Sequence, residues 1–324
     1  MSLSSLRVSP ISVRERASVL IQSEYDIQFR FTHPTPVVAL LHLHPKHNVH
    51  LATVPGIDAD DRFHAEQLSP NNEIIQEVPV DEYLDSFGNC CSRFLAPPGY
   101  LRLHGRNIIS ADDFPELQGF NLPQTPVELL PADTLQFLLA SRYCEVDLFG
   151  SIAHDLFGHL GSGWALAASI RDWVHEKVAF DYNKARPTMT AMDVFSERIG
   201  VCRDYQHLAV TLTRCMKIPA RYVTGYIGDI RVPYSGPGDF SAWYQIWIDG
   251  RWWDMDARHN YPRMGRILMA TGRDAADVAI TTSFGRASLA HFYVDSFEID
   301  AQGNRVPLVT NFTAPAPPPP PPTA

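Results

Sequence analysis

Short apolar runs alternate with turn-forming residues over the first hundred positions of the chain. Residues 26–31, 37–43 and 91–95 are rich in β-branched, aromatic and aliphatic side chains. Proline, glycine, asparagine and aspartate interrupt these runs at short intervals, which is typical of a sandwich of short strands. We therefore predict an N-terminal β-sandwich domain over residues 1–110.

The pattern changes after a stretch rich in proline and acidic residues. Residues 111–131 have this composition and are predicted to be a linker. One short helix is expected to end near residue 140, and a second short helix is expected over residues 192–198. A longer helix is predicted over residues 164–178, because apolar side chains recur there at intervals of three and four: Leu166, Ile170, Trp173, Val174 and Val178.

The clearest helical signal begins at Cys202. Apolar positions recur from it along one face as far as residue 215, so that face is expected to be buried, with Cys215 in the core. After Pro219, residues 221–228 alternate like a strand. Residues 243–248 and 252–257 form two β-prone runs around an Asp-Gly pair, which predicts a hairpin. The expected fold class is α+β, with a helix packed on an antiparallel sheet.

Composition and charge limit the binding partners, location and cofactors that the sequence predicts. The chain has 324 residues and a formal charge of −9, which argues against nucleic acid or an anionic membrane as the main partner. We find neither a signal-peptide pattern at the N-terminus nor an apolar run of about 20 residues, so a cytoplasmic location is expected. No glycine-rich phosphate loop or flavin or nicotinamide fingerprint is present, and no cofactor is expected.

Neither the cysteines nor a group of histidines in the sequence predicts a metal site. The five cysteines match no disulfide framework and include no CxxC pair, which argues against a thiolate zinc site. A group of four histidines lacks a carboxylate at a familiar spacing, so exposed strand and turn histidines are expected and no metal is predicted; the group is His42, His44, His47 and His50.

The last residues are almost all proline. From Ala314 the sequence reads APAPPPPPPTA, which is typical of an extended polyproline tail. A solvated tail is favoured over a tail that binds a polyproline-recognising partner.

Cys202 carries the strongest chemical signal. A thiol at the start of a helix lies at the positive end of the helix dipole, which favours the thiolate and predicts a reactive nucleophile. The surrounding segment GVCRDYQHLAVTLTRCMKIPARYVTGY, and the strand pair that contains AWYQIW and RWWDMDARHN, resemble the bacterial transglutaminase-like superfamily. The N-terminal region resembles the β-domain often fused ahead of bacterial members. The resemblance covers roughly residues 10–300.

The resemblance implies a papain-like domain over residues 132–300, followed by a C-terminal segment, residues 301–324. It also implies a Cys–His–Asp triad in which a thiolate attacks an amide carbonyl and histidine moves the proton. Carried over to this chain, Cys202 is the nucleophile and Asp256 is the orienting carboxylate. The family's histidine would stand at the position of Ser241, and a serine hydroxyl cannot act as base and acid near neutral pH.

Three histidines follow the cysteine in sequence. His207 lies on the same helix and is expected to be structural, and His291 has no local partner. His259 follows Asp256 by three residues, and a turn there would bring its imidazole back toward Cys202. His259 is therefore the predicted replacement base.

Four neighbours are candidates for supporting the site. Arg203 and Asp204 either tune the thiol or pair with each other, and pairing is favoured. Gln245 either hydrogen-bonds a substrate or oxyanion or stabilises the sheet, and the sheet is favoured. Trp243 is expected to shield the site from water.

Two functions remain open from the sequence. The first is a cysteine enzyme that acts on peptide or protein amide bonds through a Cys202 acyl-enzyme, as a protease or amidase rather than a cross-linker. It would use His259 as base or rely on another proton donor. The alternative is a catalytically impaired pseudoenzyme that serves as a binding or scaffold module.

Overall fold

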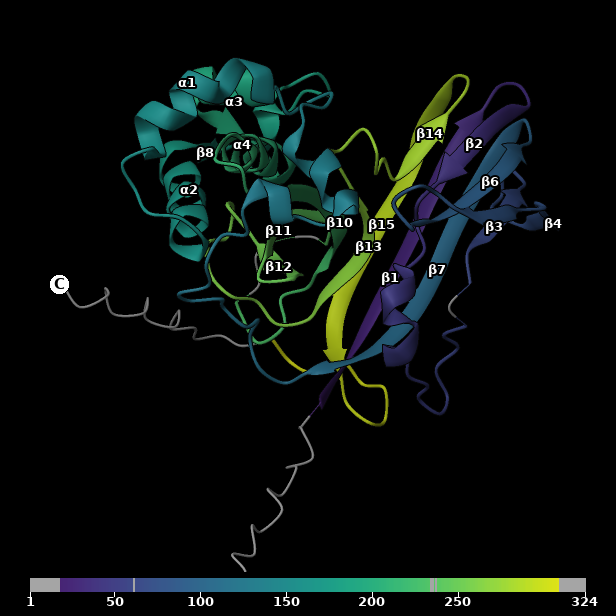
Figure 1. The fold of residues 1–324 in the computed structure, drawn as a ribbon. Helices are drawn as coiled ribbons and strands as arrows, with labels where there is room; N and C mark the ends of the chain where they lie inside the picture. Colours follow the sequence, from purple (N-terminus) through teal and green to yellow (C-terminus); the bar gives the residue numbers. More distant parts are fainter. Residues whose placement is uncertain (1–17, 61, 234–235, 237, 309–324) are drawn as a thin grey trace, which may run out of the picture.

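Two lobes lie side by side in the computed structural model, one built of strands and one of helices around a smaller sheet (Figure 1). The structure describes residues 18–60, 62–233, 236 and 238–308. The proline-rich tail predicted from Ala314 lies outside the described residues. None of the helices in this described part of the chain combines the length and the apolar composition needed to cross a bilayer.

The strand lobe is a sandwich of two antiparallel sheets, which confirms the predicted class. One sheet has the order β15-β1-β7-β3-β4, and the other has the order β14-β2-β6-β5. Their bounds are β1 (Ser18–Phe31), β2 (Thr35–Ala39), β3 (His64–Leu68), β4 (Ile74–Glu77), β5 (Asp81–Leu84), β6 (Cys90–Ala96), β7 (Gly99–Asp112), β14 (Thr281–Ser283) and β15 (Ala287–Ile299). Alternate side chains of β1, such as Ile21, Tyr25 and Ile27, are buried in one apolar cluster that includes residues of both sandwich sheets and of the second lobe.

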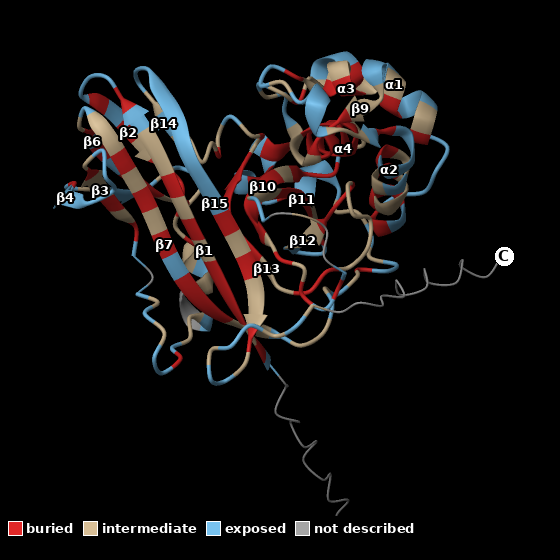
Figure 2. Ribbon diagram, turned by 180° about the vertical axis from the view of Figure 1, so that it is seen from behind, coloured by how far each residue is buried: buried red, intermediate tan, exposed pale blue. Residues whose placement is uncertain are grey.

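The two last strands belong to the sandwich. We expected residues 132–300 to stay together with the second domain, but β15 pairs with β1 along almost its whole length, from Leu20↔Ile299 to Phe31↔Ala287. β14 pairs likewise with β2. Without β15, the long and apolar β1 would be an unprotected sheet edge. In the lower half of β15 buried and partly buried residues are mixed, whereas its other half, residues 287–293, is exposed (Figure 2).

The second lobe surrounds one central helix, α4 (Cys202–Cys215). Around it lie α1 (Val146–Phe157), α2 (Trp164–Lys177), α3 (Ala191–Glu197) and the sheet β12-β11-β10-β13, with β10 (Ala220–Ile227), β11 (Ser241–Ile248), β12 (Arg251–Met255) and β13 (Arg266–Gly272). The pair β8 (Ala179–Phe180) and β9 (Ile199–Gly200) and the 3-10 turns η2 (Val127–Leu129), η3 (Ala132–Leu138) and η4 (Tyr182–Lys184) complete it. The predicted packing of this helix on an antiparallel sheet is confirmed.

α4 is buried on all sides rather than on one face. Every residue from 204 to 214 is buried, whereas Cys215 is only partly buried. The amphipathic spacing predicted a single buried face, but α1, α2, α3 and the sheet together enclose the helix. α1 was not predicted, and the segment expected to be a helix ending near residue 140 forms the 3-10 turn η3. The burial fixes the position of the helix start, and hence of Cys202.

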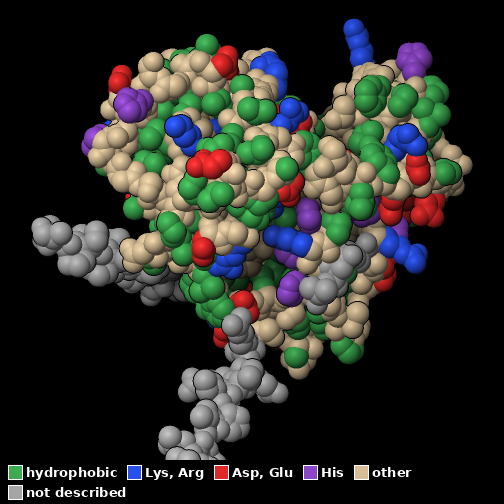
Figure 3. Space-filling model, in the orientation of Figure 1, with side chains coloured by type: hydrophobic (Ala, Val, Ile, Leu, Met, Phe, Trp, Pro, Cys, Tyr) green, Lys and Arg blue, Asp and Glu red, His purple; other side chains and the backbone are tan. Residues whose placement is uncertain are grey.

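Two of the four clustered histidines join the lobes. The strand predicted over residues 37–43 ends at Ala39, and the chain then forms the 3-10 turn η1 (Pro45–His50). The Nε2 atom of His47 accepts a hydrogen bond from the backbone N–H of Leu268 in β13, and the N–H of His44 donates to Leu268 O. Burial lowers the pKa of His44 to about 4 and that of His47 to about 3. The side chain of His47 and the backbone of His44 therefore make structural contacts, and both residues are partly buried rather than exposed as expected. Histidine and cationic side chains gather at this junction of the lobes (Figure 3).

Candidate active site

The start of α4 is capped by its own third residue. Asp204 Oδ2 accepts a hydrogen bond from the backbone N–H of Val201 at 3.0 Å, and Arg203 pairs with Asp204 at 2.9 Å. A Cβ on Gly200 would lie 2.7 Å from Cβ of Asp204, so the glycine before the helix leaves room for the cap. The spacing of Gly200, Cys202 and Asp204 thus holds the thiol at the first turn of a rigid helix.

The environment of Cys202 favours the neutral thiol. Desolvation raises the pKa of Cys202 above its ordinary value, although the Arg258 guanidinium and the backbone N–H groups of Arg203 and Ala242 oppose this shift. The direction is opposite to that expected from the helix dipole alone, because burial disfavours the charged form of the thiol. Cys202 therefore needs a base to become a nucleophile at neutral pH.

Asp256 and His259 form the pair that the sequence spacing suggested. Oδ2 of the buried Asp256 lies 2.8 Å from Nδ1 of His259, and Oδ1 accepts the backbone N–H groups of Arg258 and His259. These bonds form because the chain turns immediately after β12. Arg266 lies 3.1 Å from the same carboxylate. Although burial opposes it, Arg266 and His259 hold the pKa of Asp256 well below its ordinary value.

The imidazole of His259 is neutral at neutral pH. Burial lowers the pKa of His259 below the ordinary 6.5, although the Asp256 carboxylate opposes this shift. Because Nδ1 faces Asp256, Nδ1 carries the proton in the orientation that donates to the carboxylate, and Nε2 is left as the basic nitrogen. A neutral imidazole with a free Nε2 is the form that can accept a proton.

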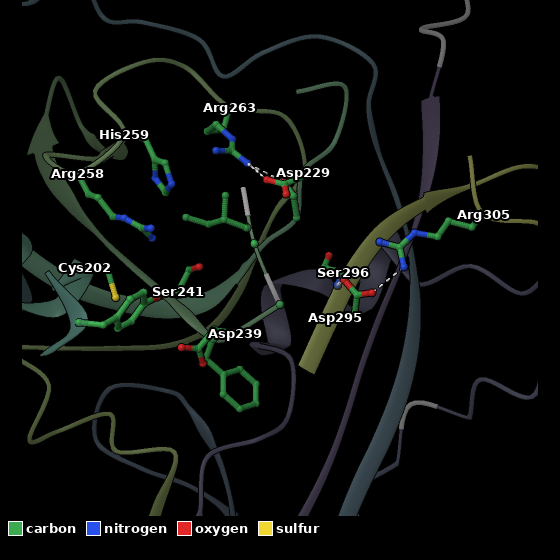
Figure 4. Close-up of a pocket in the computed structure, with 16 residues that line it drawn as sticks. Cys202, Asp229, Asp239, Ser241, Arg258, His259, Arg263, Asp295, Ser296 and Arg305 are labelled. Atoms are coloured by element: carbon green, nitrogen blue, oxygen red, sulfur yellow. Dashed lines mark hydrogen bonds and ion pairs between the residues drawn. The ribbon is translucent and has the colours of Figure 1, made fainter. Parts of the chain in front are cut away.

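Cys202, Ser241 and His259 line one recess of about 120 Å³ (Figure 4). In the close-up the ring of His259 points from its turn toward the side of the recess where Cys202 and Ser241 lie. Among the described residues, no hydrogen bond joins the Cys202 sulfur to His259. The far side of the recess carries two ion pairs, Arg263–Asp229 and Arg305–Asp295.

Three further residues of this recess were missed by the sequence analysis: Arg258, Tyr182 and Asp239. Arg258 acts on the thiol through its charge and stacks over the ring of Phe180 at 4.2 Å. Its position between Asp256 and His259 in the chain was the only sequence signal for it. The other two come from segments that only the tertiary fold brings to the thiol.

Gln206 was also missed, and it connects the elements of the site. Its Nε2 donates to Asp256 Oδ1 at 3.1 Å and to Ala242 O at 3.3 Å, and its Oε1 accepts the N–H of Ala257 at 3.2 Å. It is fully buried one turn after Cys202. That four-residue spacing places it on the same helix face as the thiol and is the signal that could have identified it.

Two predicted supporting residues lie away from the thiol. Trp243 and Gln245 both donate to Asp254 Oδ1, at 2.7 and 2.8 Å, and Gln245 also accepts from Arg221. Neither lines a recess that contains Cys202. They stabilise the face of the sheet opposite α4.

The other two downstream histidines are remote from the chemistry. His207 is buried, stacks on Tyr143 with ring centroids 4.9 Å apart, and accepts the N–H of Ala275. His291 is exposed on β15. The arrangement leaves His259 as the histidine that shares a recess with Cys202.

A second, larger recess opens on the other side of Cys202. It has a volume of about 520 Å³ and is mostly apolar. Cys202 and Ser241 line both recesses, so the thiol lies where the polar and the apolar recess meet. Its apolar walls come from both lobes: Ile27 and Phe29 of β1, Leu289 and Phe292 of β15, Phe240, Tyr222 of β10, and Val278 and Ile280.

Comparisons with known proteins agree with this architecture. Residues 152–257 match the family model of the transglutaminase-like superfamily. Over 119 residues the chain is 33% identical to "Uncharacterized protein ML0607" of Mycobacterium leprae; the match covers 36% of this chain and 42% of that protein, less than half its length. The crystal structure of a "Putative Cysteine Protease" from Cytophaga hutchinsonii is similar over 91% of this chain and 95% of that one, with 27% identity and a TM-score of 0.68.

Proposed function

Because residues 152–257 form a transglutaminase-like superfamily domain, we propose that this protein is a cysteine hydrolase that cleaves amide or peptide bonds through an acyl-enzyme on Cys202. One observation carries the proposal. Asp256 holds His259 by a 2.8 Å contact, and His259 lines the same recess as the thiol. The chain thereby presents a nucleophile, a neutral base and an orienting carboxylate, although Ser241 stands where the resemblance places the family's histidine.

The proposed reaction moves one proton through His259. Nε2 accepts the thiol proton while the sulfur of Cys202 bonds to the carbonyl carbon, and the carbonyl oxygen becomes an oxyanion. When the oxyanion collapses, the C–N bond breaks, and His259 gives the proton to the leaving amine. A water molecule then attacks the thioester with His259 again as base, which releases the acid and restores the thiol.

The other residues of the recess have defined parts in this scheme. Asp256 orients the imidazole and stabilises its protonated form, and Arg266 keeps Asp256 ionised. The positive charge of Arg258 beside the sulfur favours the negative charge that develops during attack. The polar recess is small, with about 120 Å³ of space, which suits water as acyl acceptor better than the lysine side chain of a second protein.

The apolar recess indicates the kind of substrate. Its walls of Phe292, Leu289 and Phe240 would bury an apolar side chain on the acyl side of the scissile bond. A bound substrate would cover part of the exposed half of β15, where the side chains of Leu289 and Phe292 are 58% and 43% exposed. We propose peptides with an apolar residue next to the cleaved bond as the substrate class.

The first test compares hydrolysis of fluorogenic peptide amides by the wild type and by Cys202→Ala, His259→Gln and His159→Gln. His159 is exposed outside both recesses and serves as the matched histidine control. We expect Cys202→Ala to abolish turnover and His259→Gln to reduce kcat/KM by about 10²–10⁴-fold, with His159→Gln unchanged. Full activity of His259→Gln would overturn the assignment of the base.

A non-catalytic binding protein is the second candidate, and Ser241 is the observation that favours it. Ser241→His restores the residue that the resemblance leads one to expect at this position. If the natural protein hydrolyses no peptide amide and Ser241→His does, the protein is a pseudoenzyme. If the natural protein is active, Ser241→His is expected to lower activity, because two imidazoles would compete for Asp256.

A further inference from the structure

A second group of reactive side chains lies on the sandwich, outside the Cys202 site. The side chains of His42, Glu82 and Cys90 each offer one ligand atom, and these three atoms all lie within 4.8 Å of one another. The histidine nitrogen and the glutamate oxygen are already 3.3 Å apart. Nothing in the proposed hydrolysis uses any of the three residues.

Strand pairing explains why the three side chains meet. In the β5–β6 ladder Glu82 is paired with Ser92 and Leu84 with Cys90, so Glu82, Ser92 and Cys90 project from one face. β2 lies on the other side of β6, and His42 follows the end of β2. The imidazole therefore reaches over β6 onto the same face.

The histidine is held in place by its surroundings. His42 Nε2 lies 2.7 Å from Ser92 Oγ, its ring is 5.7 Å from the ring of Phe63, and only 12% of its side chain is exposed. By contrast, 52% of the Glu82 side chain is exposed. One ligand is thus prepositioned, while another is free to adjust and leaves the site open to solvent.

We propose that His42, Glu82 and Cys90 form a zinc-binding site. Imidazole, carboxylate and thiolate are the three kinds of ligand that zinc accepts, whereas calcium and magnesium prefer oxygen ligands only. Zinc bonds of about 2.0–2.3 Å require ligand atoms closer together than 4.8 Å, which small rotations of Glu82 and Cys90 would achieve. Three protein ligands would leave a fourth position for water.

Protonation states are compatible with this site. A histidine binds zinc through the lone pair of its neutral ring, so protonation of His42 at low pH should oppose binding. The Cys90 thiol would lose its proton to solvent when the metal binds, so binding should strengthen as pH rises. His44 and His47 are engaged with β13 and do not belong to the site.

Metal titration of the full chain tests the proposal. After treatment with a chelator, the protein is titrated with zinc by calorimetry, and with cobalt to record the near-ultraviolet band of a thiolate–cobalt bond. We expect one zinc per chain for the wild type and for Cys202→Ala. The adjacent Cys91 is the matched control, because it is buried, pairs with Tyr83 and projects from the opposite face.

The variants give opposite expectations. Cys90→Ala should lose the thiolate–cobalt band and bind zinc at least about tenfold more weakly, and Glu82→Gln should also weaken zinc binding. Cys91→Ala should retain both the band and the affinity, and zinc should raise the unfolding midpoint of every variant that binds it. The absence of stoichiometric zinc binding, or binding that survives Cys90→Ala unchanged, would overturn the proposal.

Discussion

Nδ1 of His259 lies 2.8 Å from Oδ2 of Asp256, across a turn of only three residues. The buried carboxylate therefore already holds an imidazole, although the start of β11 provides only Ser241. An aspartate at the end of a strand can orient a histidine from the neighbouring strand or from its own following turn. In this chain the following turn provides it.

The pH dependence of kcat/KM should show a wide active range. His259 must be neutral to accept the proton, and its pKa is lowered, so the acid limb should lie below pH 6.5. The pKa of Cys202 is raised, so the alkaline limb should lie above pH 9. Initial rates on a peptide amide between about pH 4 and about pH 10.5 measure both limbs, because this range extends more than one unit beyond each ordinary pKa. An acid limb above pH 6.5 or an alkaline limb below pH 9, with activity confined to a narrow optimum near pH 7, would contradict the assignment.

Gln206→Leu should lower kcat by more than the accompanying loss of folding stability would explain. The substitution keeps the side-chain volume but removes the hydrogen bonds to Asp256, Ala242 and Ala257. Leaving buried partners unsatisfied should cost about 1–3 kcal/mol in the free energy of unfolding, measured with urea. We expect kcat to fall while KM stays similar, because Asp256 loses its anchor to the helix.

Thr211→Val is the matched control for this change. Thr211 is also fully buried on α4, and its hydroxyl donates to His207 O rather than to any group of the candidate site. It should lower stability without a selective effect on kcat. Equal effects of the two substitutions on kcat would show that Gln206 acts through stability alone.

Leu289→Ser should weaken the use of substrates with an apolar acyl side. Leu289 and Leu95 are both 58% exposed, but only Leu289 lines the apolar recess. We expect kcat/KM for a peptide with an apolar acyl residue to fall about tenfold in Leu289→Ser, and to be unchanged in Leu95→Ser. Both variants should cleave a substrate with a small acyl group equally well, and a loss on both substrates would count against the proposed subsite.

Stability should fall as the pH drops below 6.5. The pKa values of His44 and His47 are about 4 and about 3 in the folded protein, against an ordinary 6.5. The unfolded chain therefore binds more protons than the folded chain between pH 6.5 and 4, and stability is lost as the pH falls through that range. Each such proton changes the free energy of unfolding by about 1.4 kcal/mol per pH unit.

Urea unfolding at pH 7.5, 6, 5 and 4 measures this dependence. His47→Asn should make the dependence of stability on pH shallower, because residue 47 then takes up no proton on unfolding. It should also lower stability at pH 7.5, since the bond from Leu268 N–H to Nε2 is lost or weakened. An unchanged slope in His47→Asn would contradict the low pKa of this histidine.

Local sequence was a good guide to the elements near Cys202. Period-3.6 spacing placed α2 and α4 almost to the residue, and the Asp-Gly pair identified the β11–β12 hairpin, because both signals depend on neighbours in the chain. The link between Asp256 and His259 was predictable for the same reason, since His259 lies only three positions after Asp256. Trp243 does not lie at the thiol as expected, whereas Gln245 contacts its neighbours in the sheet, which was the favoured interpretation. Alternation along β11 directs both side chains to the other face of the sheet.

The sequence by itself determined a helix that begins at Cys202, an antiparallel sheet beside it, and a carboxylate with an imidazole three residues on. Tertiary structure alone decided the ionisation of the thiol, because desolvation depends on what packs around it. It also decided that β15 completes the sandwich and forms a wall of the apolar recess, and that His42, Glu82 and Cys90 meet on one face of the sandwich. These outcomes rest on pairings between residues far apart in the chain, and no local pattern encodes which distant strand will cover an edge.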